Sequence, residues 1–191
     1  MTHPIPIGEE KVIHQGHIIE IVQQDHQVGD RVIPFEKARR SPGVRMIIVK
    51  DGKMLLSKEY RTELGGDDYR LPGGKVFDKL EEYNEALKGE VDLVEAARGA
   101  VERECVEETG HACLSAKHIH TTSPGATISW DLYYFVVEEF EANADGQQLE
   151  GGEVIEPMWF GLDEVKEMCL DGRVQEERTA AVLMRYLDGR L

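Results

Sequence analysis

An acidic segment at residues 101–111, VERECVEETGH, places the strongest constraint on how this chain can fold. Four of its side chains are glutamates, and like charges one helical turn apart repel each other and lower helix stability. Upstream, Asp92 followed by Glu95 resembles a capping box with aspartate as the N-cap. Gly110 is a typical left-handed helix stop. The sequence therefore predicts a helix from Asp92 to about Thr109 that carries a dense set of carboxylates.

These carboxylates indicate a bound cation. Positions four apart share a helix face, so Glu104 and Glu108 form a pair, with Glu107 on the adjacent flank. Ionised carboxylates held this close together are costly unless a cation is present. All-oxygen ligands suit a hard divalent cation, with Mg²⁺ the leading candidate and Mn²⁺ the alternative. The competing interpretation is a solvated helix face, which is the usual case for a run of charges.

The formal net charge of −15 excludes some classes of function. Such a surface repels nucleic acids and phosphorylated molecules, so a phosphate substrate would need metal ions and placed arginines. The competing interpretation is that most of the acidic residues serve solubility. The sequence has no apolar run of membrane-spanning length and no signal-peptide layout at its N-terminus. Three cysteines without metal-type spacing indicate reduced thiols. We expect a cytoplasmic protein that binds neither nucleic acid nor membrane.

The rest of the chain mixes strand and helix patterns, which favours an α/β or α+β sandwich. Asp51-Gly52 is a hairpin turn signal, and Pro157 indicates that the last strand lies at a sheet edge. β-Branched and alternating residues predict strands at 12–22, 31–35, 44–50, 53–60, 127–138 and 154–160, and apolar residues at helical spacing predict helices at 78–87, 162–170 and 175–188.

A longer pattern surrounds the acidic helix. The chain reproduces the pattern G-x5-E-x7-R-E-U-x-E-E-x-G-U, in which U is an apolar residue. The fixed positions of the pattern are filled by Gly89, Glu95, Arg103, Glu104, Glu107, Glu108 and Gly110. This pattern resembles the Nudix box, the signature of the Nudix hydrolase family. Cys105 fills one apolar position acceptably. His111 stands where an aliphatic residue is usual, which we interpret as a local packing change.

The resemblance implies an α/β/α sandwich with a mixed sheet and a small N-terminal β extension. We expect residues 1–42 to form an N-terminal β-strand region and residues 43–191 to form the Nudix domain. In the subgroup that acts on ADP-ribose and nucleotide sugars, the N-terminal strands are exchanged or paired across a homodimer, so a homodimer is expected here. The alternative is an ordinary edge extension of the main sheet. Residues 77–88 are an apparent inserted helix that either lines the substrate pocket or lies on the surface.

Several shorter segments resemble the same subgroup. YRLPGG at 69–74 resembles the turn before the box, where a backbone carbonyl, here of Gly73 or Gly74, completes a metal site. RSPGV at 40–44, KEYR at 58–61 and SPG at 123–125 also resemble it. Two departures concern the specific substrate: Arg70 stands where the ADP-ribose enzymes usually carry glutamate, and the segment after SPG lacks an early glutamate.

The resemblance also implies roles for individual residues, in a reaction where water attacks a diphosphate. The implied metal ligands are Glu104, Glu107, Glu108, Glu153 and the carbonyl of Gly73 or Gly74. The implied catalytic residues are Glu107, Glu108, Glu153 and Glu150, with the general base left open. Substrate contacts are Arg61, Arg40 and Gly125, since guanidinium groups pair bidentately with phosphate. The metal ligands would be supported by Arg103, Glu95 and Gly89. Arg103 would do so by pairing with Glu107 or Glu95.

The most specific expectation is Mg²⁺-dependent hydrolysis of ADP-ribose, a nucleoside diphosphate compound, to AMP and ribose 5-phosphate. The first alternative is a pyrophosphatase for another nucleotide sugar, such as GDP-mannose. The second is a non-catalytic Nudix domain that binds a nucleotide as a sensor, although every carboxylate of the box is present. Trp130 or Tyr134 would stack a nucleobase, unless these strand aromatics belong to the core.

Overall fold

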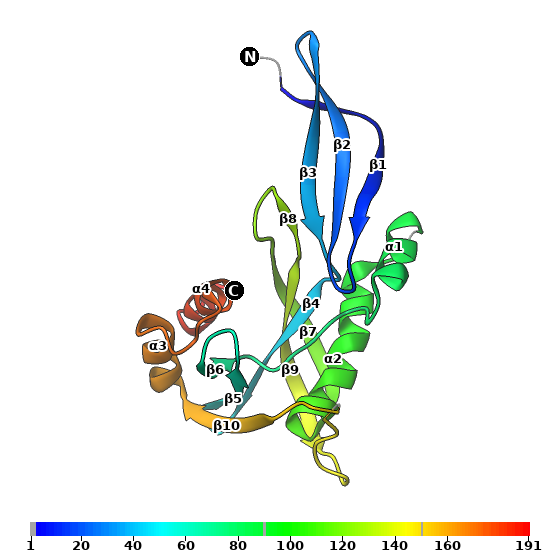
Figure 1. Cartoon of the computed structure of the whole chain (residues 1–191). Coiled ribbons are helices and arrows are strands. Elements are labelled where there is room, and N and C mark those ends of the chain that lie inside the picture. Colours follow the sequence, from blue (N-terminus) through cyan, green and yellow to red (C-terminus); the bar gives the residue numbers. More distant parts are fainter. Residues whose placement is uncertain (1–2, 90, 150) are drawn as a thin grey trace. The chain divides into compact units, whose positions relative to one another are not determined.

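The computed structural model describes residues 3–89, 91–149 and 151–191. The chain divides into two compact units. The first comprises Met1–Pro42, Phe77–Val91 and Ser123–Asp131, and the second comprises Gly43–Val76, Asp92–Thr122 and Leu132–Leu191. The first unit therefore contains two later segments of the chain in addition to its N-terminal strands. Figure 1 shows the elements in chain order.

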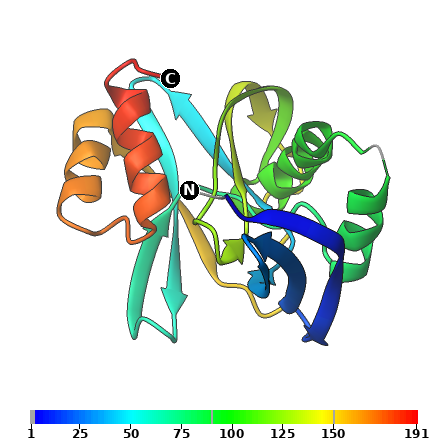
Figure 2. The same cartoon turned by 90° about the horizontal axis from the view of Figure 1, so that it is seen from above.

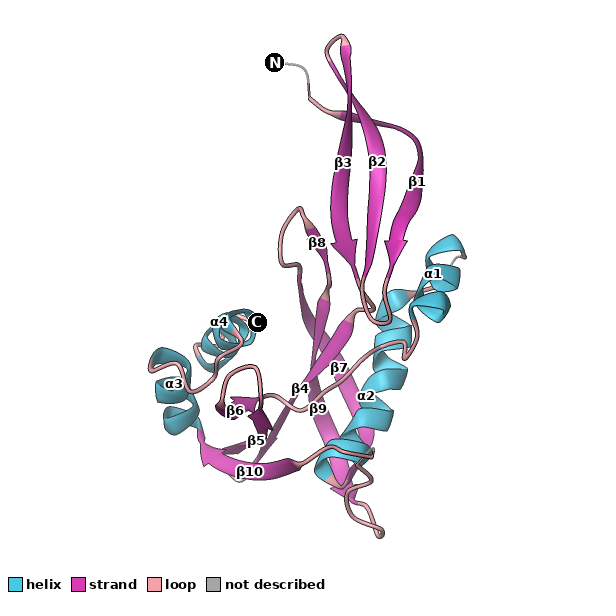
Figure 3. Cartoon of the chain, viewed as in Figure 1, coloured by secondary structure: helices cyan, strands magenta, loops and turns pink. Residues whose placement is uncertain are grey.

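A four-stranded sheet forms the first unit, and its long strands are clear in Figure 3. The three N-terminal strands are antiparallel, and the fourth pairs in parallel with the third. In sheet order they are β1 (Ile5–Gln15), β2 (Glu20–Val28), β3 (Arg31–Arg39) and β8 (Ile128–Ser129). The predicted single strand at 12–22 is wrong, because the chain reverses at Gly16, whose N–H donates to the Ile19 carbonyl at 2.8 Å.

The predicted helix at 78–87 is present as α1 (Leu80–Lys88) and belongs to this first unit. Its buried side chains are Leu80, Tyr83 and Ala86. Asn84 Nδ2 donates to Glu20 Oε2 at 3.1 Å, and Glu20 is fully buried against Arg39 at 2.6 Å. The inserted helix therefore packs on the N-terminal sheet and supplies a partner for a buried carboxylate.

The second unit is built on a mixed sheet of order β10-β5-β4-β9-β7, with β6 paired to β5. Strands β4 and β9 run parallel, and the other pairs are antiparallel. The edge position of β10 agrees with the prediction from Pro157. The strands are β4 (Gly43–Lys50), β5 (Lys53–Arg61), β6 (Gly66–Arg70), β7 (His111–Thr122), β9 (Leu132–Ala142) and β10 (Ile155–Gly161).

Some strands of this sheet differ from the sequence prediction. The sequence did not predict β6 or β7, and the predicted strand at 127–138 is divided between β8 and β9. The hairpin between β4 and β5 is as expected, because Asp51 and Gly52 both adopt positive φ, at 51° and 73°, as its tight turn requires.

Helices cover the second sheet and bury its apolar side chains. Helix α2 (Leu93–Thr109) packs on β4, β7 and β9, whereas α3 (Leu162–Leu170) packs on β5, β10 and α4 (Glu177–Leu187). Figures 1 and 2 both show α3 and α4 side by side. The mixed α/β architecture predicted from the sequence is confirmed. Within the described residues, no helix combines the length and apolar character needed to cross a membrane.

Candidate active site

Helix α2 has the ends that its sequence predicted. The Asp92 carboxylate accepts the backbone N–H groups of Val94 and Glu95 at 2.9 and 3.3 Å. At the other end Gly110 adopts φ 69°, a left-handed conformation that costs glycine little. The face that α2 buries consists of Ala97, Ala100, Val101, Cys105 and Thr109. These small side chains let the helix approach the sheet closely, which sets the direction of its glutamates.

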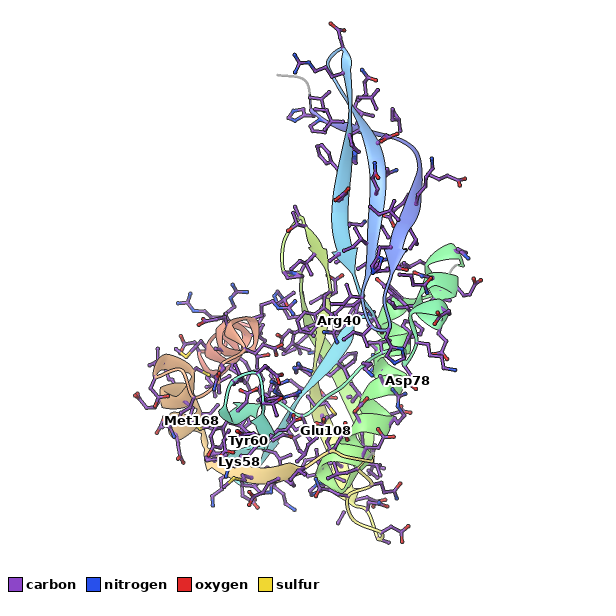
Figure 4. The ribbon with its side chains drawn as sticks, viewed as in Figure 1. Arg40, Lys58, Tyr60, Asp78, Glu108 and Met168 are labelled. Atoms are coloured by element: carbon purple, nitrogen blue, oxygen red, sulfur yellow. The ribbon has the colours of Figure 1, made fainter. Side chains whose placement is uncertain are left out.

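The glycine turn after β6 lies directly against two of these glutamates. The N–H of Gly73 donates to Glu108 Oε2 at 2.7 Å. A Cβ added at Gly74 would stand 2.2 Å from Glu104 Oε1, and one added at Gly73 would stand 2.1 Å from the Val44 carbonyl oxygen. At Gly73 the obstacle is backbone, so only glycine fits there; at Gly74 an added Cβ would displace the Glu104 carboxylate. The turn and the carboxylates are therefore packed against each other. Figure 4 labels Glu108 on α2.

Burial and mutual repulsion act strongly on these carboxylates. Burial raises the pKa of Glu104 to about 8, with further contributions from the charges of Glu108, Glu107 and Glu153. Burial also raises the pKa of Glu108 to about 7, although the Gly73 N–H and Arg45 oppose that rise. Carboxylates that tend to keep a proton at neutral pH are well suited to exchange it for a cation.

Side chains alone do not complete a metal site. Across residues 3–89, 91–149 and 151–191, no three His, Cys, Asp or Glu side chains form a group that could hold a metal ion. Mg²⁺ commonly binds proteins through one or two carboxylates and takes its other ligands from water and substrate phosphate. Glu104 and Glu108, with a carbonyl of the adjoining turn, fit that smaller set of ligands.

The raised pKa values predict how the metal-free protein responds to pH. An unfolded glutamate has a pKa of 4.5, so between that pH and about 8 the folded state holds more protons than the unfolded state. Stability should therefore fall as the pH rises through this range. We expect the melting temperature in chelator to drop from about pH 6 to about pH 8.5, and the drop to be smaller in Glu104→Gln. Equal drops in the two proteins would contradict the assigned pKa.

Arg103 joins α2 to the residue that follows the glycines. Its Nη2 donates to the Lys75 carbonyl at 3.0 Å and lies 3.5 Å from Glu104 Oε1. The same guanidinium therefore restrains the turn and one of the carboxylates. Glu95, which the sequence offered as a partner for Arg103, pairs with Arg98 at 3.3 Å.

Arg45 is a buried charge beside the site that sequence reasoning missed. Its Nε and Nη2 donate to the two carboxylate oxygens of Glu176 at 2.9 and 3.3 Å, and its Nη1 donates to the Gly73 carbonyl at 3.3 Å. Thr179 Oγ1 also donates to Glu176, at 2.5 Å. The network ties the start of α4 to the glycine turn. The available signal was an arginine inside the apolar run VRMIIVK.

Breaking this buried pair should cost stability. Glu176→Gln leaves the Arg45 guanidinium without its counter-charge, and removal of one partner from a buried ion pair costs about 3–5 kcal/mol. We expect the free energy of unfolding, measured by urea denaturation, to fall by about that amount. Glu177→Gln, at the adjacent exposed position, should change it by less than about 0.5 kcal/mol. A similar small change in both variants would show that the pair contributes little.

The remaining predicted residues fall in different places. In the second unit, Arg61 ends β5 and pairs with Glu59 at 2.6 Å, and Glu153 precedes β10. In the first unit, the Arg40 guanidinium lies 4.4 Å from the centre of the Trp130 ring, Gly125 lies in the loop before β8, and Gly89 ends α1. Glu150 lies outside the described residues. Tyr134 is fully buried and belongs to the core.

Comparison with known proteins decides the family. The model of the Nudix domain matches residues 39–181. This chain belongs to the Nudix family. It is therefore a hydrolase, as the sequence pattern around α2 indicated, and hydrolases of this family generally use divalent metal ions.

Two relatives match nearly the whole chain. A CMP-5'-(N-acetyl-N-hydroxy-3-aminopropyl)phosphonate hydrolase of Streptomyces rubellomurinus is 28% identical over 93% of this chain and 80% of the relative. An ADP-ribose pyrophosphatase of Bacillus subtilis is 24% identical over 95% of this chain and 90% of the relative. The crystal structure of an ADP compounds hydrolase superposes with a TM-score of 0.71, covering 98% of this chain and 97% of the other at 16% identity. That last likeness is one of fold.

Proposed function

We propose that this Nudix hydrolase is a Mg²⁺-dependent pyrophosphatase for nucleoside diphosphates linked to a sugar, with ADP-ribose as the leading substrate. The observation that carries the proposal is the packing of Glu104 and Glu108 against the glycine turn. One relative is named for ADP-ribose and the other for a phosphonate of CMP, and both names denote a nucleotide joined to a further group. The products from ADP-ribose would be AMP and ribose 5-phosphate.

More than one metal ion would be held. Glu104 and Glu108, with one carbonyl of the turn, would hold one ion, and Glu107 and Glu153 would supply further ligands. Between the two carbonyls of the turn we favour Gly73, because the Gly74 carbonyl already accepts the Val44 N–H at 2.9 Å. The Gly73 carbonyl accepts a longer bond, from Arg45 Nη1 at 3.3 Å. When bound, Mg²⁺ neutralises diphosphate oxygens and lowers the pKa of a ligated water.

The other steps belong to side chains of this chain. Glu153 would accept a proton from the attacking water, since it lies outside α2 and its charge acts on both Glu104 and Glu108. Glu107 and Glu150 are the alternative bases. Arg61 would offset the charge that develops on the phosphate oxygens. The roles of Arg40 and Gly125 as substrate contacts stay predictions from the sequence.

A homodimer formed through the N-terminal strands is part of the proposal. Strands β1 and β3 expose large apolar side chains, among them Ile5, Val12, Ile13, Val32 and Phe35. Exposed apolar groups at this density are typical of interaction surfaces. Residues 1–42 would then act as the dimerising region of the Nudix domain at 43–191. The unpaired cysteines Cys105, Cys113 and Cys169 support a cytoplasmic location.

A panel of nucleotides tests the proposed reaction. ADP-ribose, GDP-mannose and other nucleoside diphosphate compounds are incubated with the protein and Mg²⁺, and the products are separated by chromatography. We expect release of a nucleoside monophosphate that stops when a chelator is added. Release of phosphate or pyrophosphate from nucleoside triphosphates instead would contradict the proposal. Binding of these compounds without turnover would favour the nucleotide sensor.

A further inference from the structure

One face of the β5–β6 hairpin carries buried polar atoms that lack a protein partner. Within the described part of the chain, Ser57 Oγ, Arg61 Nε and Asp68 Oδ1 have no hydrogen-bond partner. The Ser57 and Asp68 residues are only 2% and 1% exposed. A buried polar group without a partner lowers stability, and a charged group does so most. Two such residues on one hairpin indicate that a ligand completes their hydrogen bonds.

The strand register places these groups on the same side of the hairpin. Side chains two apart on β5 point to one face, and directly opposed residues of an antiparallel pair share that face. Ser57 is opposite Arg70, and Glu59 is opposite Asp68. The hairpin face therefore consists of Ser57, Glu59, Arg61, Asp68 and Arg70.

The charges on the hairpin face are balanced before any ligand binds. Arg70 Nε donates to Asp68 Oδ2 at 2.8 Å, and Arg61 Nη2 lies 2.6 Å from Glu59 Oε2. Three groups have no partner among the described residues: the Arg61 Nε–H, which donates, Asp68 Oδ1, which accepts, and the Ser57 hydroxyl, which can donate and accept. Hydroxyl groups each donate and accept, so a polyhydroxyl group matches this set. A charged ligand group beside Asp68 would meet a carboxylate whose charge Arg70 already balances.

The course of the chain connects the hairpin face to the acidic helix. Arg70 ends β6 and lies three residues before Gly73, whose N–H donates to Glu108 Oε2 at 2.7 Å. Gln175 Nε2, just before α4, donates to the Asp67 carbonyl of β6 at 3.5 Å. The hairpin face therefore lies close to the carboxylates of α2 and to the start of α4, and all of these groups belong to the second unit.

We propose that Ser57 and Asp68 bind the hydroxyl groups of an uncharged, polyhydroxylated substituent on the substrate diphosphate. Arg70 acts as a positioning residue, because its bonds to Asp68 Oδ2 leave Oδ1 to accept from the ligand. This inference rests on the proposed function and specifies which part of the substrate these residues recognise. It also assigns a role to Arg70, which stands where the ADP-ribose enzymes usually carry glutamate.

The test compares two substrates that differ only beyond the diphosphate. One is ADP-ribose, and the other is ADP esterified with methanol on its terminal phosphate, which has no sugar hydroxyls there. Asp68→Asn should lower kcat/KM for ADP-ribose by about 10- to 100-fold, as expected for losing a hydrogen bond to a charged group. It should change kcat/KM for methyl-ADP by less than about 2-fold. Asp67→Asn is the matched control, an exposed neighbour that pairs with Lys58 at 3.1 Å.

Ser57→Ala keeps the test independent of the folding of the Asp68 variant. Removing an unpaired hydroxyl should leave the melting temperature unchanged or raise it, while kcat/KM for ADP-ribose falls by roughly 3- to 10-fold. If the wild type hydrolyses both compounds and both variants retain full selectivity for ADP-ribose, the subsite is wrong and the proposed function stands. If the wild type hydrolyses neither compound nor any other nucleotide sugar, both the proposed function and the proposed subsite are contradicted.

Discussion

Replacing Glu108 with glutamine should reduce Mg²⁺-dependent release of nucleoside monophosphate by more than about 100-fold. Glutamine keeps an oxygen that can accept the Gly73 N–H, but it lacks the charge that holds a divalent cation. Loss of a residue that only supports a metal ligand costs about 10- to 100-fold, so loss of a ligand should cost more. Initial rates with ADP-ribose at saturating Mg²⁺ measure the effect.

The same substitution should leave the protein folded and even stabilise it without metal. Burial raises the pKa of Glu108 to about 7, so ionisation of this side chain above that pH opposes folding, and glutamine removes the effect. In chelator at about pH 8.5 we expect a higher melting temperature for the variant than for the wild type. Glu102→Gln, at an exposed position on the same helix, is the control and should keep full activity. A Glu108→Gln enzyme with largely intact turnover would contradict the metal assignment.

Gly74→Ala should have the second largest effect, because the new Cβ would occupy the place of the Glu104 carboxylate. The two atoms would lie 2.2 Å apart, so the carboxylate must move away from the turn. We expect a loss of roughly 10- to 100-fold in rate at low Mg²⁺, reduced as the Mg²⁺ concentration rises, since a displaced ligand weakens binding. A Mg²⁺ titration of the initial rate measures both quantities.

A glycine on α2 supplies the matched control. Gly99 is exposed, and an added Cβ there meets no atom within 4 Å. Gly99→Ala should keep wild-type activity and gain up to about 1 kcal/mol of stability from helix propensity. Should Gly74→Ala also keep wild-type rates at low Mg²⁺, Glu104 would not be a metal ligand.

Local chemistry made α2 predictable from the sequence. Asp92 and Gly110 set its ends through contacts within a few residues, and helical spacing alone places Glu104 and Glu108 on one face. The strand at 12–22 was mispredicted because β-branched residues continue through the turn at Gly16. There the N–H of Gly16 reaches Ile19, and an added Cβ would stand 2.7 Å from the Ile19 carbonyl oxygen.

Distant contacts explain what the sequence could not reveal about the site. Arg45 lies within an apolar strand, and its partner Glu176 is 131 residues away. Ser57 and Asp68 share a face only through the register of β5 and β6, and the sequence did not predict β6. The inserted helix α1 likewise has a partner, Glu20, that lies far upstream in the chain.

Direct measurement of metal binding tests the central claim that the glutamates of α2 hold a divalent cation. Electron paramagnetic resonance reports free Mn²⁺ as the protein is titrated without substrate. The wild type and Glu102→Gln should bind Mn²⁺ alike, and Glu104→Gln should bind it at least about 10-fold more weakly. Equal binding by all three proteins would contradict the claim.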